Sequence, residues 1–405
     1  MMMLKKWILV CFGNFLAAAL MGLLLRLQFV APVGGINYQF LLHGHSHIAM
    51  LGWVYLALFA LIYHFFIPDD KVTRKQFNRL FWITELAVVG MMIAFPLQGY
   101  AVFSIIFSTL HIFSGYYFVR LVWKHQRIES LAERYLLKTA LLFMILSTCG
   151  IWCLGPAVGL LGKTSAFYQI AIQFFLHFQF NGWFIIAVLA LLFRQMKLKA
   201  ENGAFFSFYR WLMAGTLLTF ALPVSWFVSN PILLWINGIG VVAQLIAFAK
   251  LALLIRPQFS EFYGKLKEIE KIVFGFALFS LGLKVLIQLV VIFPEMALVS
   301  HQIRNFVIGF IHMIMLGIIS GFLLGFLLNG NIISWKNRFS EYGIKIFLMG
   351  FVLTEFLLFG QGLNLFFSWG EIPMYHQNLF ISSIWLVVGI IMIIFSNTNL
   401  KNSLK

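Results

Sequence analysis

The sequence predicts an all-α polytopic membrane protein with twelve transmembrane helices in three pseudo-symmetric four-helix units. Hydrophobic residues make up 62% of the 405 residues and charged residues only 10%, with a mean hydropathy of +0.94. Apolar segments of about 20 residues, the length that crosses a bilayer, recur along the whole chain. No stretch between them is long enough for a soluble domain, so we expect a single transmembrane domain over residues 1–405.

Twelve segments have the length and composition of a transmembrane helix. They are residues 7–30, 37–66, 78–97, 100–123, 136–160, 166–193, 206–228, 231–254, 270–293, 302–328, 344–367 and 375–396. Turn signals agree with these limits: Pro68-Asp69-Asp70 is expected to end the second helix and Pro257 the eighth, with outer turns near Gly162 and Pro294. The basic, then apolar, N-terminus resembles a signal peptide, but its apolar run is too long, so we expect an uncleaved first helix.

The charges of the loops predict an orientation. One set of alternate loops carries nearly all the Lys and Arg, whereas the other keeps little more than Arg26, Lys163 and Arg304. By the positive-inside rule both termini are cytoplasmic and the chain lies in the cell (inner) membrane. The basic loops include Lys5, Lys6, Lys71, Arg74, Lys75, Arg79, Lys124, Arg127, Arg134, Arg194, Lys197, Lys199, Lys265, Lys267, Lys336, Arg338, Lys401 and Lys405. The net charge of +16 therefore indicates a membrane surface rather than nucleic acid as partner.

The three cysteines indicate no disulfide framework. Cys11, Cys149 and Cys153 all fall in apolar segments. Cys149 and Cys153 are one helical turn apart, which allows either ordinary packing or a soft-metal site.

Three short strings form an internal repeat. They are HSHIAMLGW ending at Trp53, HFQFNGW ending at Trp183, and HMIMLG ending at Gly317. In each, a His precedes a Gly by five positions, and the three histidines His47, His177 and His312 are 130 and 135 residues apart. That spacing is one four-helix unit and predicts repeat units of about 1–130, 131–260 and 261–405.

These histidines share a depth in the bilayer. His47, His177 and His312 lie about ten residues into their helices, roughly 15 Å along the axis, and His111 is predicted at the same depth. An imidazole in the hydrocarbon core is costly unless it faces the bundle and finds a partner. The layer is therefore a candidate functional site; the alternative is a set of separate histidines, each hydrogen-bonded within the bundle.

Heme is the partner that these histidines suit. Low-spin heme takes two axial ligands, and neutral imidazoles on facing helices supply them without burying a net charge. On the second helix His43 and His47 share a face and His45 points elsewhere. Arg304, two turns before His312, is placed to meet heme propionates.

The pattern resembles subunit I of the heme-copper oxidase superfamily, which includes nitric oxide reductases, and the related NnrS membrane proteins. Those folds have twelve helices in three pseudo-symmetric arcs, with low-spin heme bound by histidines on helices 2 and 10. The resemblance implies that His47 and His312 are the axial ligands of a heme b, with His45 or His43 as the alternative on helix 2. His177, paired with His111 or with a spare imidazole of helix 2, is then the candidate for a second heme or a copper ion.

The chain departs from that family at the gas-reducing centre. Phe310 stands where the family has the histidine of the high-spin heme, and residues 206–228 contain no histidine for copper. His177 is followed by Phe178 and Gln179 instead of the family's His-Pro-Glu type motif. A complete heme-copper centre is therefore not expected.

The charged residues Glu85, Lys284 and Glu355 fall well inside predicted spans. An unpaired charge there costs several kcal/mol, so they are expected to pair with one another, to lie neutral along a proton path, or to reach the helix ends.

The expected function is heme-dependent electron transfer or handling of a diatomic gas such as O2 or NO. The expected partners are membrane lipid and an electron donor: a c-type cytochrome, quinol or a partner membrane subunit. A further possible function is that of a non-catalytic assembly or sensor subunit that keeps one heme, since it needs the same ligands. A twelve-helix secondary transporter is the alternative; it predicts inverted repeats and broken helices.

Overall fold

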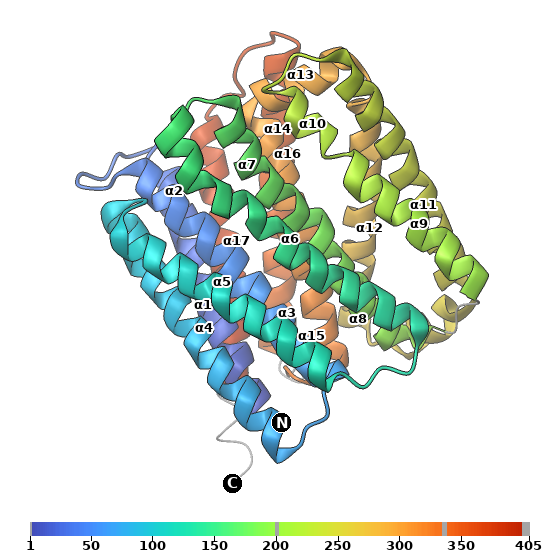
Figure 1. Cartoon of the computed structure of the whole chain (residues 1–405). Helices are drawn as coiled ribbons and strands as arrows, with labels where there is room; N and C mark the ends of the chain where they lie inside the picture. Colours follow the sequence, from blue (N-terminus) through green and yellow to red (C-terminus); the bar gives the residue numbers. More distant parts are fainter. Residues whose placement is uncertain (1, 199–201, 334–337, 399–405) are drawn as a thin grey trace. The chain divides into compact units, whose positions relative to one another are not determined.

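The computed structural model describes residues 2–198, 202–333 and 338–398. Within these ranges the chain is all-α without a β-strand, and twelve helices are long and apolar enough to cross a membrane (Figure 1). Lys199, Lys336, Lys401 and Lys405, which we used to predict the orientation, lie outside the described residues.

The twelve predicted spans are confirmed, each overlapping one helical segment. The segments are Met2–Leu27, Tyr38–Phe66, Lys71–Gln98, Val102–His125, Leu131–Leu161, Ala166–Met196, Asn202–Ser225, Pro231–Lys265, Glu268–Val290, Arg304–Asn329, Arg338–Phe366 and Tyr375–Thr398. Most exceed the prediction by a few residues because polar residues extend the helices beyond the apolar core of each span.

The contacts divide the chain into two compact units. Unit 1 comprises residues 1–127 and 323–405, and unit 2 comprises residues 128–322. The boundary at residue 127 lies close to the predicted end of the first repeat. The division into three pseudo-symmetric repeats stays a prediction.

Unit 1 is a bundle built on the first four spans and the last two. Helix α1 (Met2–Leu27) packs against α2 (Tyr38–His47), the π-helix η1 (Ile48–Tyr55) and α17 (Tyr375–Thr398). Helix α2 also packs on α4 (Lys71–Gln98), which pairs with α5 (Val102–His125), while α16 (Arg338–Phe366) pairs with α17. The segment after η1 is α3 (Leu56–Phe66), and α15 (Gly321–Asn329) enters this unit at residue 323.

Unit 2 contains the middle of the chain. Helix α6 (Leu131–Leu161) packs against α7 (Ala166–His177), the π-helix η2 (Phe178–Phe184) and α8 (Ile185–Met196). Helix α11 (Pro231–Lys265) packs against α9 (Asn202–Leu218), α10 (Ala221–Ser225) and α12 (Glu268–Val290). Helix α12 in turn contacts the π-helix η3 (Met313–Ser320), which follows α13 (Pro294–Gln302) and α14 (Arg304–His312).

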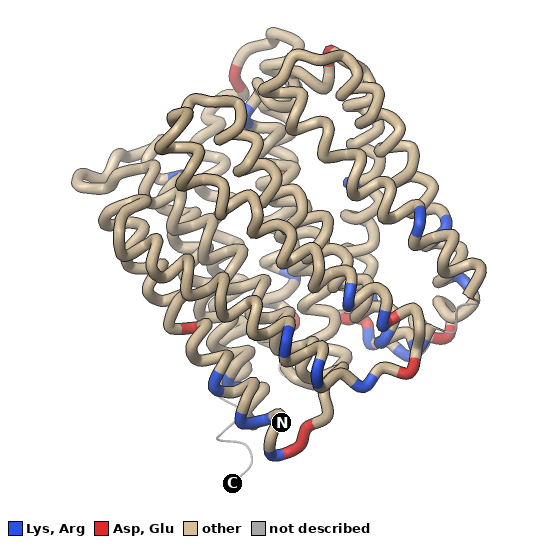
Figure 2. The backbone as a smooth tube through the Cα atoms, viewed as in Figure 1, with Lys and Arg blue, Asp and Glu red and all other residues tan. Residues whose placement is uncertain are grey.

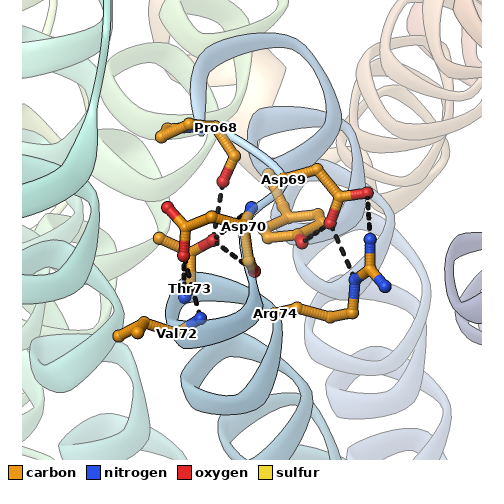
Figure 3. Close-up of polar contacts among 7 residues, drawn as sticks. Pro68, Asp69, Asp70, Val72, Thr73 and Arg74 are labelled. Carbon is orange, nitrogen blue, oxygen red and sulfur yellow. Dashed lines mark hydrogen bonds and ion pairs between the residues drawn. The ribbon is translucent and has the colours of Figure 1, made fainter.

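A capped turn separates α3 from α4, as predicted from Pro68-Asp69-Asp70. The Asp70 carboxylate accepts hydrogen bonds from the backbone N–H groups of Val72 and Thr73, both at 2.9 Å, and the Thr73 hydroxyl donates to the Pro68 carbonyl at 2.6 Å (Figure 3). These bonds satisfy N–H groups that the first turn of a helix leaves unpaired. The bond from the Thr73 backbone also lowers the pKa of Asp70.

The carboxylate of Asp69 stabilises the same turn through two further contacts. The Arg74 guanidinium donates to Asp69 at 2.8 Å, and the Tyr63 hydroxyl donates to it at 2.6 Å (Figure 3). Both contacts lower the pKa of Asp69, the Arg74 bond most, although burial opposes them. The end of α3 is therefore tied to the start of α4.

Two prolines behave differently from the prediction. Pro257 does not end the eighth span but lies inside α11, which continues to Lys265. A proline removes one backbone hydrogen bond without necessarily ending a helix, and a pair between Lys265 and Glu261 supports the turn beyond it. Pro294 does mark a turn, but it also begins the short helix α13, which we did not predict.

The seventh span is interrupted. Helix α9 ends at Leu218 and the five-residue α10 begins at Ala221, whereas the sequence suggested one continuous helix. Pro223 explains the break, because its ring has no N–H for the carbonyl of Thr219 and crowds that carbonyl in a regular helix.

Basic residues gather at one end of unit 1. Figure 2 shows Lys and Arg concentrated towards the end of this unit where the N-terminus lies. This matches the alternation of the loops; the side of the membrane stays a prediction.

Candidate functional site

Each of the three motif histidines ends an α-helix and is followed directly by a π-helix. His47 precedes η1, His177 precedes η2 and His312 precedes η3. In a π-helix the backbone N–H bonds to the carbonyl five residues back, which changes the register of side chains at that point, and such segments are rare and frequent at functional sites. The repeat predicted from three short strings is therefore also a repeat of backbone geometry.

His47 presents one ring nitrogen to its surroundings. Its Nδ1 lies 2.8 Å from the backbone carbonyl of His43, so Nδ1 carries the proton and donates. Its Nε2 lies 3.4 Å from the Tyr100 hydroxyl, a long contact, and its ring centroid lies 4.2 Å from that of Phe95. His47 is thus a neutral imidazole whose Nε2 is basic and only weakly bound.

A glycine turn places Tyr100 beside His47. Gly99 ends α4 with φ +62°, a conformation that suits glycine, and a Cβ there would lie 2.5 Å from the Phe40 ring. Tyr100 follows at once and contacts the rings of both His43 and His47. His43 and His47 therefore share a face, as predicted.

His111 on α5 is buried, with 5% of its surface exposed, and lies against the same π-helix. It hydrogen-bonds to the backbone of Leu51 within η1, and its ring packs edge-on to Tyr55 at 4.6 Å. Its Nε2 has no hydrogen-bond partner among the described residues. Unit 1 therefore holds two imidazoles with an available Nε2: His47, directly before η1, and His111, which packs against η1.

His45 faces α1 instead. Its Nδ1 lies 2.8 Å from the Ala18 carbonyl, and its ring packs so closely on Gly22 that a Cβ there would come within 2.9 Å. It points away from the face of His43 and His47, as the helical spacing predicted. Its role as an alternative ligand stays a prediction.

In unit 2, His177 donates from Nε2 to the Thr216 carbonyl at 2.8 Å. The ring packs near Phe178 and Phe220. With Nε2 occupied, Nδ1 is the nitrogen left for a ligand. In His47 and His111 the available nitrogen is Nε2 instead. The candidate ligand histidines therefore do not all offer the same ring nitrogen.

The other predicted ligands of unit 2 lie on one short helix. His312 is the last residue of α14, and Arg304 is its first residue, exposed and two turns away. His47 belongs to unit 1 and His312 to unit 2, so the predicted axial pair stays a prediction. The described residues contain no group of three or more His, Cys, Asp or Glu side chains suited to hold a metal ion.

The charged residues inside the spans have separate partners. Glu85 accepts a hydrogen bond from Asn14 at 2.8 Å, and the same amide donates to the Gly52 carbonyl of η1 at 3.2 Å. Glu355 interacts electrostatically with Arg26. Lys284 donates to Gln244 at 3.1 Å. Glu85 and Glu355 belong to unit 1 and Lys284 to unit 2, so the expectation that these residues pair with one another stays a prediction.

Sequence analysis missed Tyr100 and the π-helices. Tyr100 lies 53 residues from His47 in the chain, and no local pattern connects them. Each π-helix begins directly after the motif histidine and contains the motif glycine. The fixed His-to-Gly spacing was therefore the sign of the π-helices in the sequence.

Comparison of the chain with known protein families found no matching family, and comparison with curated proteins found no significant match.

Proposed function

We propose that this chain is a heme-binding membrane protein that works in electron transfer or in handling a diatomic gas. The observation that supports this most is the pair of imidazoles beside η1. His47 and His111 each have a backbone hydrogen bond, and each keeps Nε2 available in an apolar, aromatic setting. A backbone carbonyl that accepts from one ring nitrogen is the usual way to orient a histidine ligand through the other nitrogen.

The residues fit heme by their chemistry. His47 is the first ligand in this proposal, and His312 or His111 is the second. The His43 carbonyl fixes the tautomer of His47, and the backbone of Leu51 orients His111. Bound heme would supply one-electron redox chemistry and, where an axial position is open, gas binding.

The Tyr100 hydroxyl has a specific part in the proposal. It donates to Nε2 of His47 over 3.4 Å, a contact weaker than an ordinary hydrogen bond. A ligand on Nε2 replaces that contact at small cost, and the hydroxyl then remains close to the ligand.

The test is the reduced-minus-oxidised optical spectrum of the purified protein, compared with variants. We expect b-type bands that His47→Ala abolishes. His111→Ala and His312→Ala identify the second ligand, because only the true ligand changes the axial coordination. His64→Ala is the matched control, since His64 is exposed on α3 of the same unit. Bands unchanged by His47→Ala would refute the assignment.

We also propose the cell (inner) membrane as location, with both termini cytoplasmic, on the strength of the basic loops. The described residues lie almost entirely in spans and leave little room for an extramembrane domain with a redox cofactor of its own. We therefore propose that the electron donor is a c-type cytochrome, quinol or a partner membrane subunit. Reporter fusions at each terminus test the orientation; an external C-terminus would contradict it.

A second candidate function is secondary transport. The break between α9 and α10 favours it, because discontinuous helices form the central sites of many transporters. A colourless, iron-free protein from heme-replete cells would favour this candidate over heme binding.

A further inference from the structure

Unit 2 contains a lysine buried inside a transmembrane helix. Lys284 lies on α12 with 4% of its surface exposed. Among the described residues no carboxylate forms an ion pair with it. A buried cation of this kind is costly in a membrane protein, and such residues are retained where they bind something.

The ammonium group is only partly satisfied by the protein. It donates one hydrogen bond, to the Gln244 side-chain carbonyl at 3.1 Å. The Gln244 amide in turn donates to the Thr219 hydroxyl at 3.1 Å, and that hydroxyl donates to the Gly215 carbonyl at 2.7 Å. No carboxylate takes part in this chain of hydrogen bonds. Since an ammonium has three N–H donors, two remain for a ligand.

The helix break holds this chain in place. Thr219 lies between α9 and α10, and a Cβ at Gly240 of α11 would come within 2.7 Å of the Thr219 backbone nitrogen. Only a glycine lets α11 approach so closely. The approach brings Gln244, one turn further along α11, against the break.

A cavity adjoins the ammonium. It has a volume of about 50 Å³, and its polar lining residues are Lys284, Gln244, Thr216 and Asn181, set among apolar side chains such as Phe208 and Phe248. This volume suffices for a few water molecules or one small ion, at about 10–15 Å³ for each water by this measure. It is too small for a sugar, a nucleotide or heme.

Asn181 also lines the cavity. Its Nδ2 donates to the His177 carbonyl at 3.2 Å, so its Oδ1 is turned the other way and has no hydrogen-bond partner among the described residues. A bare anion next to this oxygen would be repelled. A ligand that also carries an O–H satisfies it by donating.

We propose that the cavity binds a small monovalent oxyanion that carries its own O–H, with hydrogencarbonate as the simplest member of the class. Its negative oxygens accept from the two spare donors of Lys284, and its hydroxyl donates to Oδ1 of Asn181. The ligand neutralises the buried charge and satisfies both unpaired groups. The residues that form this site all belong to unit 2, and the proposal does not depend on heme.

The test compares hydrogencarbonate with nitrate, which has the same charge and planar shape but no proton. The thermal unfolding midpoint of the purified protein is measured against the concentration of each sodium salt, at equal ionic strength and pH 8 in closed cells. We expect a saturable rise with hydrogencarbonate, with half-saturation at a concentration at least about tenfold lower than for nitrate, as a bound ligand stabilises only the folded state.

Variants identify the groups that bind. Lys284→Met should abolish the saturable effect of both anions, and Lys284→Gln repeats the test with a polar side chain if the methionine variant does not fold. Asn181→Leu should remove the preference for hydrogencarbonate while leaving nitrate binding. Lys271→Met is the matched control, because Lys271 lies on the same helix but pairs with Glu268 at 2.7 Å near its end.

Two results would overturn the proposal. One is a linear, equal response to both salts in the native protein and in Lys284→Gln, which is a general salt effect. The other is nitrate binding as tightly as hydrogencarbonate, which would remove the role of Asn181.

Discussion

Replacing the motif glycine Gly182 by alanine tests whether this position must be glycine so that η2 can pack closely on α6. A Cβ at this position of η2 would lie 2.6 Å from Cγ and 2.7 Å from Cβ of Phe143 on α6. Ordinary contact begins at about 3.4 Å, so the two segments must separate by roughly 0.8 Å. Phe143 Cβ is fixed to the backbone of α6, and rotation of the ring alone does not relieve the contact.

The size of the effect follows from that displacement. A gap of 0.5–1 Å loses a quarter to a half of the dispersion energy of the atoms concerned, and inserting a methylene into a tight core costs about 1–3 kcal/mol. The higher helix propensity of alanine returns up to about 1 kcal/mol. We expect Gly182→Ala to lower the free energy of unfolding by about 1–2 kcal/mol.

The assay is the unfolding of the purified protein in detergent micelles, followed by circular dichroism as denaturant is added. Gly155→Ala is the matched control, because Gly155 lies on α6 and an added Cβ there meets nothing within 4 Å. That variant should be neutral or slightly stabilised. Equal stability of the two variants would refute the packing role of Gly182.

Two further predictions concern unit 1. Asn14→Leu should lower the free energy of unfolding by about 1–3 kcal/mol, because it leaves Glu85 and the Gly52 carbonyl without their shared donor. Denaturant unfolding measures this change, with Asn378→Leu at an exposed position as the control. An unchanged midpoint in Asn14→Leu would show that the Asn14 hydrogen bonds do not stabilise the fold. Asp69 has a lowered pKa in the folded protein, so its pair with Arg74 stabilises the fold above the ordinary pKa near 4 and is lost as the pH falls below the folded value. Stability measured from pH 6 to pH 3 should therefore fall less in Asp69→Asn than in the native protein, by under about 1 kcal/mol for so exposed a pair, and identical curves would contradict this.

The number and approximate positions of the spans followed from the sequence because they depend on length, hydropathy and loop charge. Their limits did not follow in every case, since α11 continues to Lys265. The turn before α4 was also predictable, since Pro68 and Asp70 act locally. The effect of a proline inside a span could not be predicted from the sequence. Pro223 interrupts its span near Thr219, whereas Pro257 leaves α11 intact. At the Pro223 break, the Thr219 carbonyl accepts from the Leu222 N–H at 3.3 Å, while the Thr219 hydroxyl donates to the Gly215 carbonyl within α9 and accepts from the Gln244 amide of α11. Of these partners only Gln244 comes from tertiary packing.

The candidate sites were predictable only as a set of histidines. Their equivalent positions could be read from the spacing of His47, His177 and His312. The sequence could not show which nitrogen each ring leaves available for a ligand. That depends on which nitrogen bonds to a backbone carbonyl, such as that of His43 or Thr216. The oxyanion site was marked in the sequence by Lys284 alone, since Asn181 and Gln244 reach it from distant segments.

The measurement that tests the central claim most directly is the heme content per chain of protein purified from heme-replete cells, determined from the pyridine hemochrome spectrum together with total iron. We predict close to one heme b or more per chain in the native protein, and loss of heme in His47→Ala while His64→Ala keeps it. A folded native protein without heme and without iron would contradict the account.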